Sequence, residues 1–263
     1  MEGQVSLGRG IAAVGIVLGL IAIWVDFGPA SYWSFDGSLG GLLLILELLA
    51  LLALAGAYTD GSRNYDIAYG AIGGVGFGLY LFYPALAAFE DWGQLDAGAW
   101  LGLCSALTFI GASIATWPSD RPAWRPSALG TVVALAGLAL VVAGIFPNIG
   151  EGGGSYWDAG SNGHSFAIVL IALVVLEALS ILAAWSMASG MDSAVLLGAV
   201  TFGAVLAIPA RAAFDQFGQL GAGAWLAGIG GIVLIVGVLI MRQMADEGAP
   251  APSAPPQPTP PAA

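Results

Sequence analysis

The chain has 263 residues, of which 58% are hydrophobic and 9% are charged, and its formal net charge at pH 7 is −11. Soluble domains carry roughly 25% charged residues, so this composition excludes an ordinary soluble domain. It predicts instead that lipid is the solvent for most of the protein surface.

Eight apolar stretches follow one another along the chain, and each is long enough to cross a membrane as a helix. A spanning helix needs about 20 mostly apolar residues to cross a hydrocarbon core about 30 Å thick. The stretches do not alternate in polarity as the strands of a membrane barrel would. We therefore predict an all-α integral membrane protein with eight transmembrane helices, near residues 7–25, 40–58, 67–89, 97–117, 128–147, 164–188, 194–213 and 221–241.

The basic residues predict the orientation of these helices. The chain contains no lysine and six arginines, and cytoplasmic loops carry an excess of basic residues. Both termini and the loops between even- and odd-numbered helices are therefore predicted to be cytoplasmic, in a multi-pass protein of the cell membrane. The arginines that carry this prediction are Arg9, Arg63, Arg121, Arg125 and Arg242.

The loops after helices 1, 3, 5 and 7 then face outward, and they are acidic. They include Asp26, Asp36, Asp96 and Asp158. Such a surface argues against nucleic acid as a partner, because nucleic acid is bound mainly through basic residues. The partners that we expect are membrane lipid and, within the membrane, another protein or a second copy of the chain.

Several kinds of chemistry are excluded by residues that are missing or occur once. Without lysine there is no Schiff-base amine and no phosphate-binding Walker A loop. One cysteine, Cys104, allows no internal disulfide, and one histidine, His164, allows no bis-histidine haem site and no histidine-rich zinc site. We therefore predict that the protein is not an enzyme and holds no cofactor or metal.

The sequence contains an internal repeat. Residues 88–101 recur as residues 213–226, at an offset of 125. The tripeptide Ser-Tyr-Trp at 31–33 recurs at 155–157, and Glu47 recurs as Glu177. Because each copy has an even number of spans, both must enter the membrane from the same side. This pattern predicts two parallel four-helix repeats, at residues 1–120 and 121–243.

The composition changes abruptly after the second repeat. Residues 244–263 are rich in alanine and proline. Such a segment has too little apolar surface to fold and favours extended polyproline conformations. We expect a disordered cytoplasmic tail.

Glu47 and Glu177 are the candidate functional residues inside the membrane. A carboxylate near the middle of a spanning helix is costly by a few kcal/mol, so each must be protonated, paired or exposed to water. One interpretation is structural: a protonated acid that forms a hydrogen bond to a neighbouring helix. The other is a pair of proton or cation sites, one in each repeat.

The outer face supplies a second group of candidates. Tyr32, Trp33, Tyr156 and Trp157 are interpreted as anchors at the membrane interface, where tyrosine and tryptophan concentrate. The alternative is that they form a recognition surface. Arg211 and Asp215 have the spacing of an ion pair on one helix face, with an anion-attracting role for Arg211 as the alternative.

Each half resembles the uncharacterised four-span membrane proteins that are frequent in high-GC Gram-positive bacteria. The resemblance rests on the aromatic outer loops at 32–33 and 156–157, the acids Glu47 and Glu177, and the Gly-Ala-Trp-Leu sequences at 98–101 and 223–226. It covers nearly all of residues 7–241. It implies the four-span unit and implies no activity.

Two hypotheses for function follow. The preferred one is a non-enzymatic structural or accessory membrane protein, such as a scaffold subunit of a membrane assembly. The alternative is a small transporter or channel that uses Glu47 and Glu177 in a shared cavity. The first is preferred because transporters usually have broken helices or more polar groups at the membrane midplane.

Overall fold

A computed structural model describes residues 2–27, 30–35, 37–60, 63–87, 95–116, 126–150, 154–158, 164–212 and 217–247. Within these ranges the chain forms eight helices of 18 to 26 residues, together with the short helix α2, Tyr32–Phe35, and the 3-10 turn η2, Phe217–Gln219. The long helices are α1, Glu2–Trp24; α3, Gly37–Asp60; α4, Arg63–Ala87; α5, Ala97–Ala115; α6, Ala128–Ile145; α7, Ser165–Ala183; α8, Ala188–Ala212; and α9, Ala222–Glu247.

In the part of the chain that the structure describes, seven helices are long and apolar enough to cross a membrane: α1, α3, α5, α6, α7, α8 and α9. The prediction of an all-α, multi-pass membrane protein is confirmed at this level. The remaining long helix is α4, which begins with polar residues that include Asn64 and Asp66. It packs inside the bundle against α3, α5 and α8.

Several predicted helix ends differ from those observed. The sixth predicted helix, at 164–188, ends at Ala183, because a turn at 184–187 leads directly into α8. Consequently α8 begins at Ala188, six residues earlier than predicted. The predicted tail also starts too early, since α9 continues through Glu247. Residues 248–263, which make up the rest of the predicted tail, lie outside the described residues.

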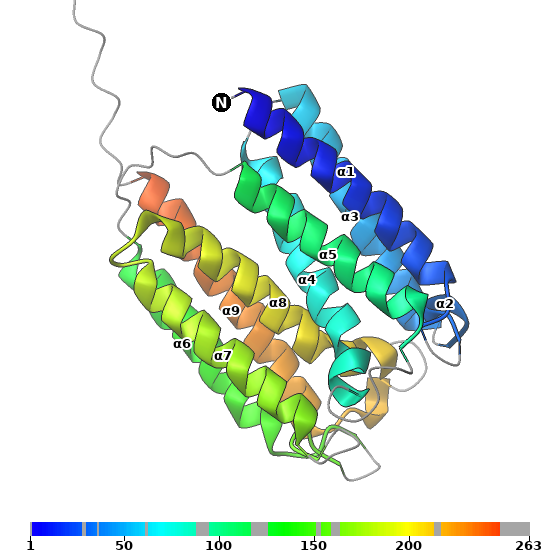
Figure 1. Cartoon of the computed structure of the whole chain (residues 1–263). Coiled ribbons are helices and arrows are strands. Elements are labelled where there is room, and N and C mark those ends of the chain that lie inside the picture. The colour runs from blue at the N-terminus through cyan, green and yellow to red at the C-terminus, as the bar shows by residue number, and fades with distance from the viewer. Residues whose placement is uncertain are drawn as a thin grey trace, which may run out of the picture.

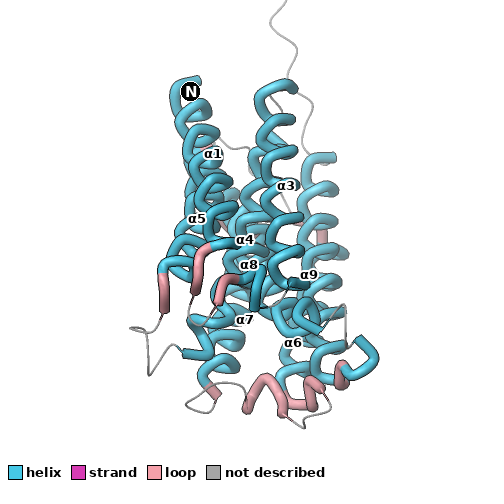
Figure 2. The backbone as a smooth tube through the Cα atoms, turned by 90° about the vertical axis from the view of Figure 1, so that its right-hand side faces the viewer, coloured by secondary structure: helices cyan, strands magenta, loops and turns pink. Residues whose placement is uncertain are grey.

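The long helices form two neighbouring groups (Figures 1 and 2). In the first group α1 packs along α5, and α4 packs against α3 and α5. In the second group α6 packs along α9, and α8 packs against α7 and α9. The two groups meet mainly through α4 and α8, which lie side by side at the centre of the molecule.

Small residues bring α4 and α8 into close contact. A Cβ added to Gly78 would overlap the backbone of α8 around Val200 and Ala204, and one added to Gly203 would overlap the backbone of Val75. A Cβ on Gly74 would approach Ala199 Cβ at 2.8 Å. In lipid, helix association depends on such close packing because lipid tails are as apolar as the side chains. Gly74 and Gly78 of α4 therefore pack directly against small residues and backbone of α8.

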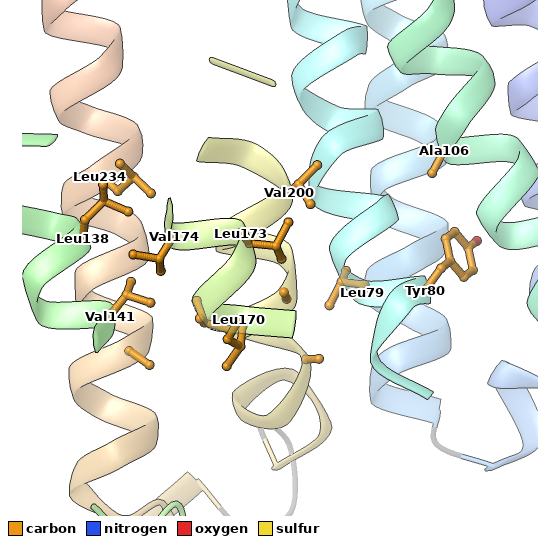
Figure 3. Close-up of a cluster of buried hydrophobic side chains, with 14 of the residues drawn as sticks. Leu79, Tyr80, Ala106, Leu138, Val141, Leu170, Leu173, Val174, Val200 and Leu234 are labelled. Carbon is orange, nitrogen blue, oxygen red and sulfur yellow. The ribbon is translucent and has the colours of Figure 1, made fainter. Parts of the chain in front are cut away.

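The interior of the bundle is apolar and includes several large side chains with almost no exposed surface, among them Leu79, Tyr80, Leu170 and Leu173 (Figure 3). Large apolar side chains also point outward from both groups of helices, as at Leu52, 66% exposed, and Val132, 64% exposed. An apolar outer surface of this kind suits contact with lipid.

Candidate functional site

Glu47 lies on the inner face of α3 and is 5% exposed. Its Oε1 atom is 3.4 Å from Ser105 Oγ on α5. The Ser105 hydroxyl donates a hydrogen bond of 2.8 Å to the Gly15 carbonyl on α1. The carboxyl group therefore lies where three helices of the first group meet.

Gly19 of α1 provides the space for this carboxyl group. A Cβ built on Gly19 would overlap Glu47 Oε1, and it would lie 2.7 Å from Ser105 Oγ. Any other residue at position 19 would have to displace the acid or the serine. The absence of a side chain at Gly19 thus places Glu47 within the helix packing.

A small cavity lies beside Glu47. It has a volume of about 10 Å³, which is at the lower limit of the space that one water molecule needs. Tyr80 of α4 also lines it, and Figure 3 shows Tyr80 and Ala106 on the facing sides of α4 and α5. The other lining residues are Leu43, Leu46, Ile72, Gly73, Gly76, Ala106 and Phe109.

Glu177 lies on α7 and has no exposed surface. A Cβ built on Gly198 of α8 would lie 3.2 Å from Glu177 Oε1 and 3.8 Å from Ile235 Cδ1 of α9. Neither carboxyl oxygen has a hydrogen-bond partner among the described residues. The acid is therefore buried where α7 packs against Gly198 of α8.

Glu177 does not line the cavity beside Glu47. Every residue that lines the cavity beside Glu47 belongs to α3, α4 or α5, whereas Glu177 contacts α8. The cavity beside Glu47 therefore does not support the alternative hypothesis of a cavity that both glutamates share. Each carboxyl group is enclosed within its own group of four helices.

The aromatic loops separate into buried tyrosines and more exposed tryptophans. Tyr32 and Tyr156 have no exposed surface, and the Tyr156 hydroxyl donates a hydrogen bond of 2.9 Å to the Val205 carbonyl. Trp33 is 41% exposed, and Trp157 is partly exposed. The interpretation as interface anchors or as a recognition surface is therefore wrong for the tyrosines, because a fully buried ring reaches neither headgroups nor a partner. It remains open for the tryptophans.

Each tryptophan pairs with an aromatic ring at the end of a long helix. The ring centroids of Trp24 and Trp33 are 4.9 Å apart, and those of Phe146 and Trp157 are 5.7 Å apart. The Nδ1 atom of His164 lies 2.6 Å from the Trp157 carbonyl oxygen, and His164 has a left-handed backbone with φ of 64°. His164 immediately precedes α7, the helix that carries Glu177.

The second loop also contains a carboxylate outside the membrane-spanning segments. Asp158 Oδ2 accepts a hydrogen bond of 2.7 Å from the Ser155 hydroxyl and one of 3.3 Å from the Ser155 amide. These hydrogen bonds lower the pKa of Asp158 because they favour its charged form. In the first loop, Ser31 and Ser34 make the equivalent contacts without a carboxylate.

The predicted ion pair between Arg211 and Asp215 falls outside what the structure describes. The backbone of Arg211 belongs to α8, but its side chain is not described, and Asp215 lies outside the described residues. This pair therefore stays a prediction. Within the described ranges, no group of three histidine, cysteine or acidic residues is arranged to hold a metal ion.

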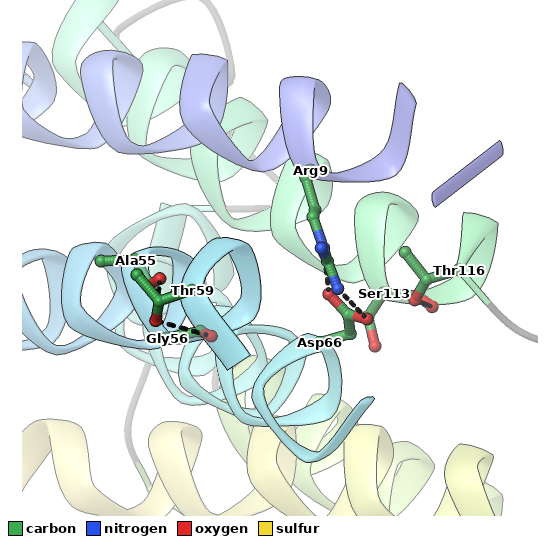
Figure 4. Close-up of polar contacts among 7 residues, drawn as sticks. All are labelled: Arg9, Ala55, Gly56, Thr59, Asp66, Ser113 and Thr116. Carbon is green, nitrogen blue, oxygen red and sulfur yellow. Dashed lines mark hydrogen bonds and ion pairs between the residues drawn. The ribbon is translucent and has the colours of Figure 1, made fainter. Parts of the chain in front are cut away.

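Sequence reasoning missed a buried ion pair near the N-terminus (Figure 4). Arg9 of α1 contacts both carboxylate oxygens of Asp66 of α4, at 3.1 and 3.3 Å. The two side chains are 11% and 4% exposed, respectively. The guanidinium group also lies 5.6 Å from the centroid of the Tyr58 ring. The available signal was an acidic residue, Asp66, in the polar first turn of a helix that is apolar farther along.

Comparisons with known proteins bring no further information on this site. No family model, no curated protein and no solved structure matches the chain. The positions and contacts of Glu47 and Glu177 are therefore the basis for assigning a function.

Proposed function

We propose that the protein is a non-enzymatic structural or accessory subunit of a membrane assembly. One observation carries this proposal: each intramembrane carboxyl group lies against a glycine of a neighbouring helix, Glu47 against Gly19 and Glu177 against Gly198. A group enclosed in this way joins helices. It fixes their distance and rotation, which a scaffold must keep constant.

The cost of burying an acid explains why the contacts matter. A charged carboxylate inside hydrocarbon is costly by a few kcal/mol, so each acid is expected to carry its proton. A protonated carboxyl can then donate a hydrogen bond within the bundle. In lipid, where apolar side chains give no net drive for association, packing and hydrogen bonds of this kind provide the specificity.

The proposal includes α4 as the eighth transmembrane helix. Its 25 residues are sufficient for a membrane-spanning helix, and its charged residue Asp66 is paired with Arg9. It is surrounded by apolar helices that meet the length and hydropathy expected for spans. A neutralised charge near a helix end costs much less than an unpaired one at the membrane centre.

The duplication into two parallel four-helix units is supported by helix contacts. In each unit the first helix packs along the fourth, and the third packs against the second and the fourth. Gly15 of α1 faces the Ser105 carbonyl, just as Gly137 of α6 faces the Gly230 carbonyl. The first helices of the units therefore correspond at an offset of 122, and the last helices at an offset of 125.

Backbone contacts in the outer loops repeat in the same way. The Gly98 amide donates a hydrogen bond of 2.8 Å to the Asp26 carbonyl, and the Gly223 amide donates one of 2.9 Å to the Asn148 carbonyl. Isolated bridges join Asp26 to Ser31 and Asn148 to Ser155. The repeated contacts indicate that Asp26 and Asn148 occupy equivalent positions in the two units, although the two residues differ.

The orientation that we propose keeps both termini in the cytoplasm and the protein in the cell membrane. Arg9, near the start of α1, contacts Asp66, and Arg242, near the end of α9, donates a hydrogen bond of 3.2 Å to Asn64 Oδ1. Both arginines thus contact the first turns of α4. Two basic residues at one end of the bundle support a cytoplasmic location for that end. The resemblance to four-span proteins of high-GC Gram-positive bacteria belongs to the same proposal.

The alternative function is a small transporter or channel, and the cavity beside Glu47 is the observation that favours it. A buried acid next to a space for one water molecule could take part in proton movement. The site would then be local to the first unit, since Glu177 does not line the cavity.

The two functions differ in what they expect of Glu47→Gln and Glu177→Gln. Glutamine is nearly isosteric and donates a hydrogen bond, so a structural role predicts that both variants keep the wild-type free energy of unfolding to within about 1 kcal/mol, whereas Ala costs about 2 to 4 kcal/mol. Purified full-length protein is compared in denaturation assays and in liposomes under a proton or cation gradient. Wild-type flux equal to that of protein-free liposomes is expected. Flux in the wild type that disappears in a stably folded Gln variant would overturn the structural proposal.

A further inference from the structure

We propose that one end of the first unit binds the ammonium group of a zwitterionic lipid headgroup, through the rings of Trp24 and Trp33 and the carboxylates of Asp26 and Asp96. The matching end of the second unit is expected to lack this preference. The inference is independent of the proposed function, because a scaffold and a transporter both contact lipid headgroups. It also holds whichever membrane surface this end of the protein faces.

Trp24 and Trp33 form an exposed aromatic pair. Trp24 is the last residue of α1, and Trp33 lies in α2, which Figure 1 shows beside the end of α1. The ring centroids are 4.9 Å apart, and the two residues remain 57% and 41% exposed. The end of a membrane-spanning helix lies at headgroup depth, where tryptophan concentrates. The exposed parts of both rings are therefore placed to meet a lipid headgroup.

Two carboxylates belong to the same end of the bundle. The Asp26 carbonyl accepts a hydrogen bond of 2.8 Å from the Gly98 amide. The Phe27 carbonyl accepts one of 3.1 Å from the Asp96 amide. These main-chain bonds bring Asp26 and Asp96 together at the start of α5, and both residues are exposed. Asp96 is the N-cap residue of α5, but its side chain makes no capping hydrogen bond. Its carboxylate is thus not used to hold the helix end.

An ammonium group fits this combination of aromatic rings and negative charge. Asp26 is two residues from Trp24, so their Cα atoms are at most about 8 Å apart. This distance is within the Debye length of about 10 Å at 0.1 M salt, so the carboxylates attract a cation to the rings and repel an anionic headgroup. A cation over the face of a tryptophan ring is also attracted by the ring itself. At headgroup depth, the cation at the highest local concentration is the ammonium group of a zwitterionic lipid.

The two acids have neutral counterparts in the second unit. The Gly221 amide donates a hydrogen bond of 3.0 Å to the carbonyl that follows Asn148, as the Asp96 amide does to the carbonyl that follows Asp26. Asn148 therefore corresponds to Asp26, and Gly221 corresponds to Asp96. The negative charge that these two positions supply in the first unit is missing in the second.

The aromatic pair of the second unit is also less available. The ring centroids of Phe146 and Trp157 are 5.7 Å apart, and the His164 ring lies 4.5 Å from Trp157. Trp157 is only partly exposed. The neighbouring acid, Asp158, accepts hydrogen bonds from the Ser155 hydroxyl and amide. This pair thus offers a cation less ring surface, and its nearby carboxylate is already engaged.

The experiment identifies the lipid that lies beside the tryptophan pair. Full-length protein is placed in nanodiscs of equal parts phosphatidylethanolamine and phosphatidylglycerol, with bromine atoms on the upper acyl chains of one lipid or the other. Bromine quenches tryptophan fluorescence at short range. Because the chain has nine tryptophans, the signal of the pair is taken as the emission lost in the double variant Trp24→Phe with Trp33→Phe. We expect the zwitterionic lipid to be preferred roughly tenfold at this pair, through the ring and the charges together.

The double variant Asp26→Asn with Asp96→Asn tests the contribution of charge. Asparagine has nearly the same shape, and the main-chain bonds that join the two residues do not depend on the side chains. The preference for the zwitterionic lipid should fall to roughly threefold, the effect of the rings alone. The unaltered protein should show the same fall at about 1 M salt, where the Debye length is about 3 Å. The signal of Trp157, isolated with Trp157→Phe, should show a preference below about twofold throughout.

The remaining outcomes decide against the proposal. Equal quenching of the Trp24 and Trp33 pair by the two lipids would overturn it, as would a preference that neither the asparagine variant nor salt reduces. A soluble amine is the other source of an ammonium group. In nanodiscs of phosphatidylglycerol alone, millimolar ethanolamine is expected to leave the emission of the pair unchanged. A change in emission that disappears in the asparagine variant would assign the site to soluble amines and contradict its assignment to lipid.

Discussion

Glu47 and Glu177 occupy comparable places in the two halves of the molecule, yet their surroundings differ. Glu47 has a serine, a tyrosine and a small cavity beside it. Glu177 is buried against Gly198 of α8, and no hydrogen-bond partner of its carboxyl oxygens is found among the described residues. The comparison teaches that one acid in a bundle can be retained through polar contacts and another through packing alone.

The largest expected effect concerns a feature of the first half only. Arg9 and Asp66 form a buried ion pair, and the matching positions of the second half hold Thr131 and Met191. Removing one partner, as in Asp66→Met, leaves the partly buried Arg9 unpaired and should cost about 3 to 4 kcal/mol in the free energy of unfolding, the lower part of the range for buried pairs. Chemical denaturation in detergent micelles measures this loss.

The control for that prediction replaces both partners of the ion pair by the residues found at the matching positions of the second half. In the double variant Arg9→Thr with Asp66→Met both charges disappear together, so most of the stability should return. A double variant that is as unstable as Asp66→Met would mean that the ion pair is not the reason for the loss.

The next effect tests the contact through which the halves meet. A Cβ on Gly78 would overlap the backbone of α8, and a backbone cannot move aside as a side chain can. Gly78→Ala should therefore cost about 3 kcal/mol. Gly111→Ala is the matched control, because a Cβ there meets no atom within 4 Å. Equal melting temperatures for the two variants would show that α4 and α8 do not pack as described.

A smaller effect separates the two acids. Gly19→Ala places a methyl group where the Glu47 carboxyl lies and should cost about 2 kcal/mol. Gly198→Ala brings a methyl group only to 3.2 Å from Glu177 Oε1, so its cost should stay below about 1 kcal/mol. Thermal unfolding of both variants in the same detergent gives the comparison, and the reverse order would contradict the assigned positions of the acids.

Much of the fold could be predicted from the sequence because the apolar runs are long. Seven of the eight predicted spans correspond to helices of membrane-spanning length and hydropathy. Helix ends were less predictable. Nothing in the local sequence showed that the turn after Ala183 would be short and that α8 would begin at Ala188.

The site was only partly predictable. The position of Glu47 and Glu177 inside the membrane follows from counting residues, but their neighbours depend on which helices pack together. Gly19, Ser105 and Tyr80 are ordinary residues of apolar helices until α1, α4 and α5 meet around Glu47. Tyr32 and Tyr156 were predicted to be exposed because they lie in loops, but tertiary packing buries both rings.

The smallest expected effect compares the two outer loops as the pH falls. The lowered pKa of Asp158 means that the folded loop favours the carboxylate. The stabilisation of the folded loop by ionised Asp158 is therefore fully present above the ordinary pKa of aspartate. It is lost as the pH falls through the lowered pKa of Asp158. Amide signals of Ser155 should shift in that acidic range, while those of Ser31, whose partner Ser34 does not titrate there, should not. Parallel shifts at both serines in an NMR titration would contradict the assignment.

The central claim is that each carboxyl group holds its helices together by occupying the space that a glycine leaves open. A double-mutant cycle of Gly19→Ala and Glu47→Ala tests it most directly, with the free energy of unfolding as the readout. The most severe overlap of the methyl group added at position 19 is with the Glu47 carboxyl. Because that overlap disappears with the carboxyl, the double variant should be more stable than the sum of the single effects implies, by about 1 to 2 kcal/mol. Strictly additive effects would contradict the claim.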